Sequence, residues 1–252
     1  MPILKDDADR WFRTYHHGDR RLPTLLCLPH AGGSASAYLA LSAALAGRMR
    51  VVAVQYPGRQ ERRTEAPVGD LPTLAARLHA VLAGLPEPPA AYFGHSMGAL
   101  VAFELLRAQA AAGEAGPRMF FASGRRAPSA ARRSAVYRRS DEGIISELRR
   151  LGGTDLRLFD DHEIMRAVMP AVRADYRAVE TYSCAPDSVV SCPITALIGE
   201  EDAQVTVAEA ELWAKHTTGP FSLRTLPGGH FFVDTSRELV VDVLLDHLPA
   251  LT

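Results

Sequence analysis

A serine between two glycines, in the stretch YFGHSMGA at 92–99, is the first feature of this sequence that could carry chemistry. The apolar run AAYF leads into the stretch, and the helix-forming run ALVAFELLRA leaves it. A strand–turn–helix of this kind presents a nucleophilic serine above a sheet. The flanking glycines remove side chains where strand and helix crowd each other. We therefore interpret Ser96 as a candidate nucleophile, with an ordinary turn serine as the alternative.

A serine hydroxyl is a poor nucleophile at neutral pH, so it needs a base and a carboxylate that orients the base. In hydrolases with this turn, the chain order is serine, acid, histidine. His230, in the loop LPGGHFF after the last predicted strand, fits the base. Asp202 ends the segment IGEED, and we choose it over Glu200 and Glu201 because it lies furthest beyond its strand. His95, beside the serine, is expected to point away from the hydroxyl and to be structural.

Acyl transfer through a serine also needs N–H donors for the negative oxygen of the tetrahedral intermediate. One donor in this type of site is the N–H that follows the nucleophile, here that of Met97. The second comes from a loop after an early strand, and LPHAGG at 28–33 is such a loop. We predict Ala31 as this donor, and a simple glycine turn is the alternative.

The bulk properties of the chain exclude several functions. Its 252 residues are 47% hydrophobic and 23% charged, which is typical of a soluble globular protein with a sizeable core. A formal net charge of -1 gives no field toward nucleic acid or a membrane surface. With three cysteines and no evident signal peptide, we expect a cytoplasmic protein with reduced thiols, no metal and no organic cofactor. Six other histidines are expected to be solvated: His16, His17, His79, His162, His216 and His247.

Short apolar runs alternate with helical patterns, which predicts an α/β fold with a mostly parallel sheet flanked by helices. The runs are apolar on both faces, as in buried parallel strands. Strands are predicted at 24–28, 50–55, 90–93, 118–122, 194–198 and 222–226.

Helix signals fall between these strands. Asp70 is predicted to cap one helix, and capping boxes are predicted at Thr206 with Glu209 and at Thr235 with Glu238. In the last helix, the predicted core-facing residues are Leu239, Val243 and Leu244. The remaining predicted helices cover 35–46, 71–82, 97–112, 142–151 and about 162–182.

The alternation breaks between residues 122 and 194, where two helical patterns occur without a strand. Pro170 lies inside the second pattern and predicts a kink or break. An insertion of this size is expected to cover the end of the sheet where ligands bind. We therefore expect one domain over 1–252, with a lid insertion at about 128–190.

Together the motifs resemble those of type II thioesterases, which accompany polyketide synthases and nonribosomal peptide synthetases. The resemblance implies an α/β-hydrolase fold with a helical lid and catalysis by Ser96, Asp202 and His230. It further implies hydrolysis of aberrant or stalled acyl groups from the phosphopantetheine arm of acyl or peptidyl carrier proteins. The matching pieces span nearly the whole chain and are WFR at 11–13, LPHAGG, YPGR at 56–59, GHSMGA, SGRRAP at 123–128, Gly199-x-x-Asp202 and GGHFF.

Two further patterns bear on the substrate. Apolar residues at helical spacing in the lid indicate either ordinary packing or a wall for the acyl chain, and Met165 and Met169 are chosen as substrate contacts. Arginine clusters indicate either a solvated face or docking of an acidic carrier protein, and Arg59 and Arg125 are chosen as contacts. The lid residues are Ile164, Met165, Val168, Met169 and Val172, and the arginines are Arg59, Arg62, Arg63, Arg125, Arg126, Arg132, Arg133, Arg138 and Arg139.

Two other functions stay open. A general esterase or lipase acting on small oxyesters would use the same residues. A non-catalytic ligand-binding module on a hydrolase fold is the alternative from another class, because fold and function are separable.

Overall fold

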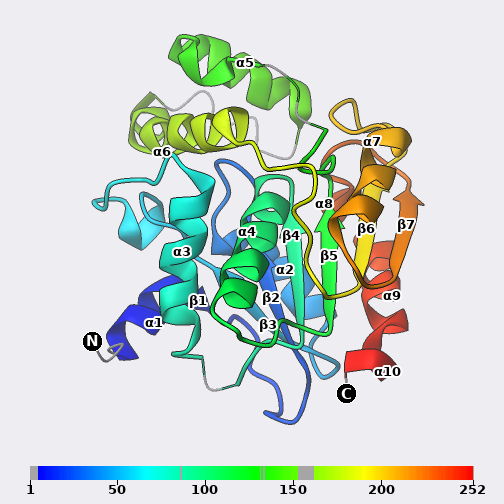
Figure 1. Ribbon diagram of the computed structural model, residues 1–252. Coiled ribbons are helices and arrows are strands. Elements are labelled where there is room, and N and C mark those ends of the chain that lie inside the picture. Colours follow the sequence, from blue (N-terminus) through cyan, green and yellow to red (C-terminus); the bar gives the residue numbers. More distant parts are fainter. Residues whose placement is uncertain (1–4, 86, 131, 133, 153–161, 252) are drawn as a thin grey trace.

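The computed structural model describes residues 5–85, 87–130, 132, 134–152 and 162–251. Among these residues, seven strands form one sheet in the order β1-β3-β2-β4-β5-β6-β7 (Figure 1). All neighbouring strands are parallel except β1, which is antiparallel to β3. The predicted α/β class with a mostly parallel sheet is confirmed. The strands are β1 (Phe12–Arg13), β2 (Thr24–Leu28), β3 (Arg50–Val54), β4 (Ala91–His95), β5 (Met119–Ser123), β6 (Ile194–Gly199) and β7 (Phe221–Leu226).

Six of these strands lie within two residues of their predicted bounds, because buried parallel strands read as continuous apolar runs. Strand β1 was not predicted. It is two residues long, too short for any periodicity, and only its pairing with β3 makes it a strand. Together with α1 (Lys5–Trp11), it covers the edge of the sheet.

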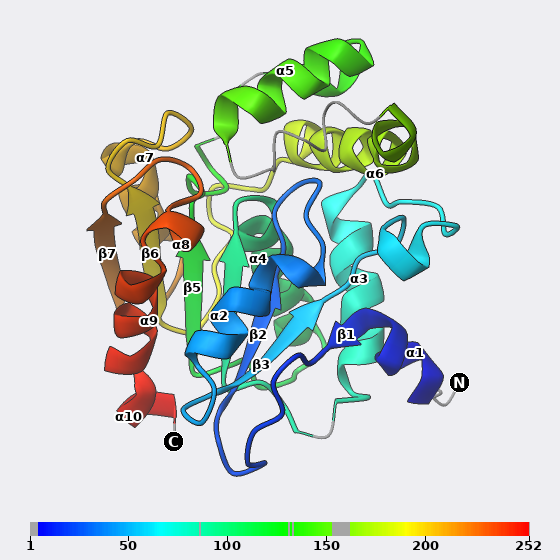
Figure 2. The ribbon, with the colours of Figure 1, turned by 180° about the vertical axis from the view of Figure 1, so that it is seen from behind.

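Helices cover both faces of the sheet (Figure 2). On one face, α3 (Leu71–Leu82) and α4 (Met97–Ala111) pack with Trp213 of the short helix η5 (Leu212–His216). On the other face lie α2 (Leu39–Ala44), α9 (Arg237–Asp246) and α10 (Leu248–Leu251). Two large apolar cores result, one on each side of the strands.

The predicted helix starts can be checked at their caps. The Asp70 carboxylate accepts the Thr73 N–H at 2.8 Å, and Thr206 with Glu209 forms the predicted capping box before α7 (Val207–Glu211). The second predicted capping box is wrong. Thr235, its predicted first residue, is the last residue of α8 (Phe232–Thr235), and Ser236 is the residue before α9. Leu239, predicted to face the core, is 42% exposed, and the next residue, a valine, lies in the core instead.

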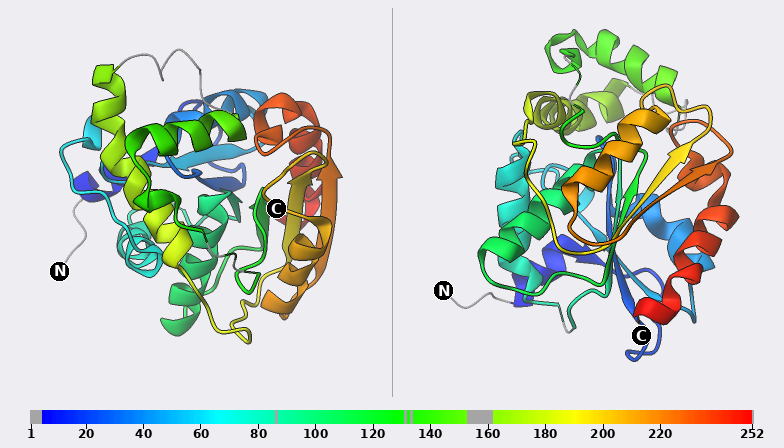
Figure 3. Two further views of the ribbon diagram at one scale, coloured as in Figure 1. Left: turned by 90° about the horizontal axis from the view of Figure 1, so that it is seen from above. Right: turned by 45° about the vertical axis from the view of Figure 1, so that its right-hand side comes forward.

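The helices of the insertion, α5 (Asp141–Leu151) and α6 (His162–Thr181), lie across the carboxyl ends of the strands (Figures 1 and 3). Helix α6 is continuous through Pro170, so the predicted break is wrong. Buried neighbours on both sides, Met169 and Ala171, stabilise the helix against the loss of one hydrogen bond. Among the described residues, no helix is long and apolar enough to cross a membrane.

Candidate active site

Ser96 occupies a one-residue turn between β4 and α4. Its backbone has φ 54° and ψ -112°, a conformation that costs a non-glycine residue about 1–3 kcal/mol. The turn is held by the Ser96 N–H, which donates to the Ser123 carbonyl at the end of β5 at 2.8 Å. A sharp turn at this position lifts the serine hydroxyl above the carboxyl end of the sheet.

The two glycines around Ser96 are needed for close backbone approach. A Cβ on Gly98 would collide with the carbonyl of Leu28 in β2, and a Cβ on Gly94 would collide with the backbone of Gly98. The Gly-x-Ser-x-Gly spacing therefore lets α4 start directly against the neighbouring strands.

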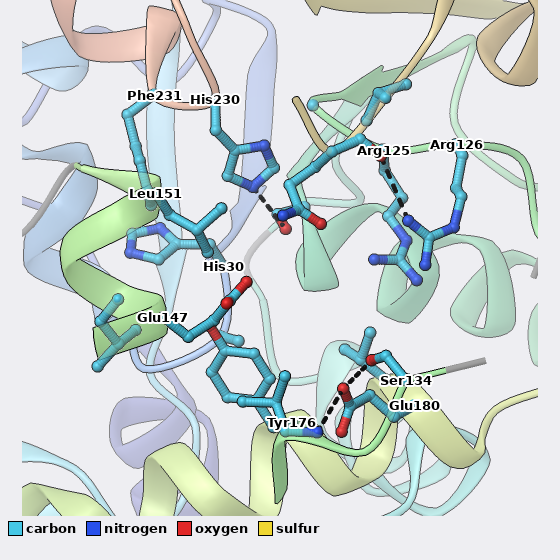
Figure 4. Close-up of a pocket in the computed structure, with 18 residues that line it drawn as sticks. His30, Arg125, Arg126, Ser134, Glu147, Leu151, Tyr176, Glu180, His230 and Phe231 are labelled. Atoms are coloured by element: carbon cyan, nitrogen blue, oxygen red, sulfur yellow. Dashed lines mark hydrogen bonds between the residues drawn. The ribbon is translucent and has the colours of Figure 1, made fainter. Parts of the chain in front are cut away.

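Ser96, His230 and Asp202 meet at this end of the sheet. His230 Nε2 lies 3.0 Å from Ser96 Oγ (Figure 4). On its other side, His230 Nδ1 lies 2.8 Å from Asp202 Oδ2. Asp202 and His230 are each 7% exposed. A carboxylate at Nδ1 selects the tautomer with its proton there, which leaves Nε2 free to accept the serine proton. Glu200 and Glu201 are exposed.

The loops that carry the acid and the histidine touch each other. They follow β6 and β7, which pair along six residues. A Cβ on Gly199 would collide with the carbonyls of Gly228 and Gly229. Adjacent parallel strands thus bring Asp202 and His230 together although 28 residues separate them.

The two predicted oxyanion donors occupy the loop after β2 and the start of α4. Ala31 lines the same cavity as the serine hydroxyl. Met97 begins α4, and the first N–H groups of a helix have no acceptor within the helix. Gly32 follows Ala31 with φ 75°, and its N–H donates to the carboxylate of Asp175 in α6 at 2.7 Å.

Two other imidazole rings, those of His30 and His95, lie near His230. His30 packs edge-on against Phe231 with ring centres 4.9 Å apart, and His95 lies 5.3 Å from the His230 ring. Burial, followed by the nearby His230, lowers the pKa of His30 to about 4 and the pKa of His95 well below its ordinary value. His95 Nδ1 lies 2.9 Å from Ser123 Oγ, which fits the structural role predicted for it.

A cavity of about 90 Å³ lies between Ser96 and His230 on one side and residues of α5 and α6 on the other (Figure 4). Its apolar wall comes mainly from the insertion. The residues of this wall are Val136, Leu148, Leu151, Tyr176 and Val179.

The predicted contacts Met165 and Met169 are not among the described residues that line this cavity. They are buried on another face of α6, against Ile144 of α5 and Val136 of η3 (Val136–Arg138). Ile164 and Val168 are 40% and 39% exposed. Helix α6 thus has a face toward α5 and a face toward the cavity, and periodicity alone does not distinguish the two.

Of the two arginines predicted to contact the substrate, one lines the cavity and the other does not. Arg125 lines the cavity, and burial together with the adjacent Arg126 lowers its pKa to about 9. Arg59 is 7% exposed and forms a buried ion pair with Asp175. Its position in the fold corrects the prediction of a substrate contact. Arg133 and the side chain of His162 lie outside the described residues.

Sequence reasoning missed several residues of the site. The ring of His30 and the side chain of Tyr176 line the cavity, and Asp175 is buried against the loop of Gly32. An acid spaced with the apolar residues of an amphipathic helix was an available signal for Asp175. His216, expected to be solvated, is fully buried and lies 2.7 Å from Ser129 Oγ.

Comparison with known proteins places the chain among thioesterases. The sequence model of the Thioesterase domain family matches residues 23–251. A probable cadicidin biosynthesis thioesterase of Streptomyces griseus is 51% identical over 93% of this chain and 65% of its own length, so this chain spans about two thirds of that relative. Thioesterase PikA5 of Streptomyces venezuelae is 41% identical over 97% of this chain and 88% of its own. The structure of the type II thioesterase BorB from the borrelidin biosynthetic cluster is 47% identical over 95% of this chain and 98% of its own, with a TM-score of 0.88.

Proposed function

The chain belongs to the thioesterase family, as its motifs predicted, and from this premise we propose that it hydrolyses acyl thioesters through Ser96, His230 and Asp202. The observation that carries the proposal is the continuous hydrogen-bonded chain from the Ser96 hydroxyl to the Asp202 carboxylate at the base of the cavity.

In the proposed reaction, Ser96 Oγ attacks the thioester carbonyl while His230 Nε2 takes the hydroxyl proton. The N–H groups of Ala31 and Met97 bind the oxyanion, and Asp202 stabilises the imidazolium. His230 then gives the proton to the departing thiol, a good leaving group because its pKa is about 8–9. Water, deprotonated by His230, attacks the acyl-enzyme, and the acid leaves with Ser96 regenerated.

The proposed substrates are aberrant or stalled acyl groups on the phosphopantetheine arm of acyl or peptidyl carrier proteins. Support comes from relatives named for antibiotic biosynthesis, including the cadicidin thioesterase and the gramicidin S biosynthesis protein GrsT. Residues 128–190 would act as the lid that encloses the acyl group in one domain spanning the chain.

Mass spectrometry of a panel of acylated carrier proteins, before and after incubation with the enzyme, tests the proposal. The wild type is expected to release the acyl groups, and Ser96→Ala to lower kcat by about 10³-fold or more with an unchanged melting temperature. Equal hydrolysis by both proteins would refute the role of Ser96. A higher kcat/KM for a nitrophenyl ester than for every carrier thioester would instead favour a general esterase, and binding without turnover a non-catalytic module.

A further inference from the structure

The carboxylate of Asp175 joins α6 to the loop that carries Ala31. Asp175 is 1% exposed, and its Oδ2 accepts the Gly32 N–H at 2.7 Å. The two elements also pack tightly, because a Cβ on Gly32 would lie 3.2 Å from Val172 Cγ2 of α6. Asp175 is not among the described residues that line the cavity, so it is placed to act on the loop rather than on a substrate.

Arg59 binds the same carboxylate oxygen. Its Nη2 donates to Asp175 Oδ2, and its Nη1 donates to the Pro57 carbonyl at 2.8 Å. The pair is almost fully enclosed, with side chains 6% and 2% exposed. The segment before Arg59 also supports the loop, because the Gln55 side chain accepts the Ala35 N–H at 2.8 Å.

Stability alone does not explain such a pair. Enclosing two charges costs desolvation energy, and replacing a buried pair by apolar residues of similar volume is often neutral or stabilising. What the pair provides is a charged, immobile acceptor for one backbone N–H. That N–H belongs to Gly32, the residue after Ala31. Fixing the direction of the Gly32 N–H limits how the peptide group between Ala31 and Gly32 can rotate.

We propose that Asp175, held by Arg59, is a positioning residue for the oxyanion hole, which it orients through the Gly32 N–H. This inference rests on the proposed function, since the hole serves the acyl transfer at Ser96. It makes α6 part of the catalytic support: the oxyanion donor at Ala31 is held in place when the helix lies against the loop.

The double variant Arg59→Met/Asp175→Leu tests the proposal, because it removes both charges and the acceptor while keeping an apolar fill. We expect kcat to fall about 10- to 100-fold, with KM within about twofold and little change in melting temperature. A trifluoromethyl ketone analogue of the acyl thioester forms a hemiketal oxyanion on Ser96, so its Ki should rise in step with the fall in kcat/KM. The Ki of the carboxylic acid product should not change.

Two further variants complete the experiment. Glu65→Gln weakens the ion pair of Arg62, a 5% exposed arginine in the turn after Arg59 that also donates to the Gln55 carbonyl, and its kinetics should match the wild type. Asp175→Asn keeps an oxygen acceptor without the charge and should show a loss of about three- to tenfold in kcat. It also serves as the test if the double variant fails to fold.

An unchanged kcat in a folded variant would overturn the proposal, and so would a parallel weakening of the ketone and the product. Each protein is assayed on a carrier thioester and on a nitrophenyl ester. Failure of the wild type on the thioester would refute the proposed function, whereas the Asp175 effect would still be read on the ester.

Discussion

At the scale of single residues, the site depends on which imidazole carries a proton. His30 lies beside His230, and burial lowers the pKa of His30 to about 4. A positive charge on His30 would oppose the imidazolium that His230 must form during catalysis. The low pKa keeps His30 neutral at the pH where the serine reacts.

The His30 pKa predicts how stability depends on pH. Well above pH 6.5 the His30 ring is neutral in both the native and the unfolded state. Its titration then takes nothing from the free energy of unfolding. Between pH 6.5 and 4 the His30 ring is protonated in the unfolded chain but stays neutral in the native state. The free energy of unfolding therefore falls as pH falls. At pH 5 this loss of unfolding free energy should be about 1–2 kcal/mol. The range extends below the value that the full pKa difference would give, because the ring is partly open to the cavity.

Denaturant unfolding of His30→Phe at pH 7 and pH 5 measures this contribution. The variant keeps a ring against Phe231 but cannot titrate, so it should lose about 1–2 kcal/mol less than the wild type on acidification. His17→Phe, at an exposed position, is the matched control and should show the wild-type dependence. Identical pH profiles for His30→Phe and the wild type would contradict the prediction.

At the scale of elements, α6 has separate tasks on separate faces. Met165 and Met169 bind it to α5, Asp175 holds the loop before Gly32, and Tyr176 and Val179 face the cavity. A single amphipathic helix therefore packs against α5, contacts the loop and forms part of the cavity wall.

The cavity face of α6 should set the acyl preference. Val179→Phe fills part of the space and should shift the optimum toward shorter acyl chains. Val168→Phe makes the same change on an exposed face of the same helix and should leave the preference unchanged. Competition between acetyl, butyryl and octanoyl carrier thioesters, followed by mass spectrometry, gives the ratio of kcat/KM values. A shift caused by Val168→Phe instead would identify the face chosen from the sequence as the acyl wall.

At the scale of the whole molecule, the net charge is only -1, and many surface arginines form ion pairs with carboxylates. Arg132 is paired with Glu209, and Arg139 with Glu147. Arg138 is exposed and stacks on Tyr137, in the short helix η3 beside the cavity. Docking of an acidic carrier protein at the lid would therefore depend on a few exposed arginines rather than on a broad basic field.

Charge reversal at two places separates these possibilities. Arg138→Glu and Arg48→Glu both change the net charge from -1 to -3, but Arg48 lies at the opposite end of the sheet, before β3. We expect Arg138→Glu to raise KM for an acyl carrier protein severalfold at about 50 mM salt, and the difference to shrink at about 500 mM. Arg48→Glu and a small soluble thioester should show no such effect. If Arg138→Glu and Arg48→Glu raise KM equally, the effect comes from net charge alone, and docking at the lid is contradicted.

The sequence by itself determined six of the seven strands and the identities of the acid and base that meet Ser96. Buried parallel strands are continuous apolar runs, and the Gly-x-Ser-x-Gly turn needs glycine where backbones touch, so both leave local signals. Chain order then favoured Asp202 and His230, because loops after neighbouring parallel strands share one end of the sheet.

Only the tertiary structure decided which face of α6 meets the cavity, that Arg59 is enclosed with Asp175, and that α9 starts one residue later than its capping signal. Strand β1 likewise exists through its pairing with β3. Each of these depends on contacts between segments far apart in the chain. Helical periodicity specifies that a residue is buried, but the partner that buries it is set by how the elements pack.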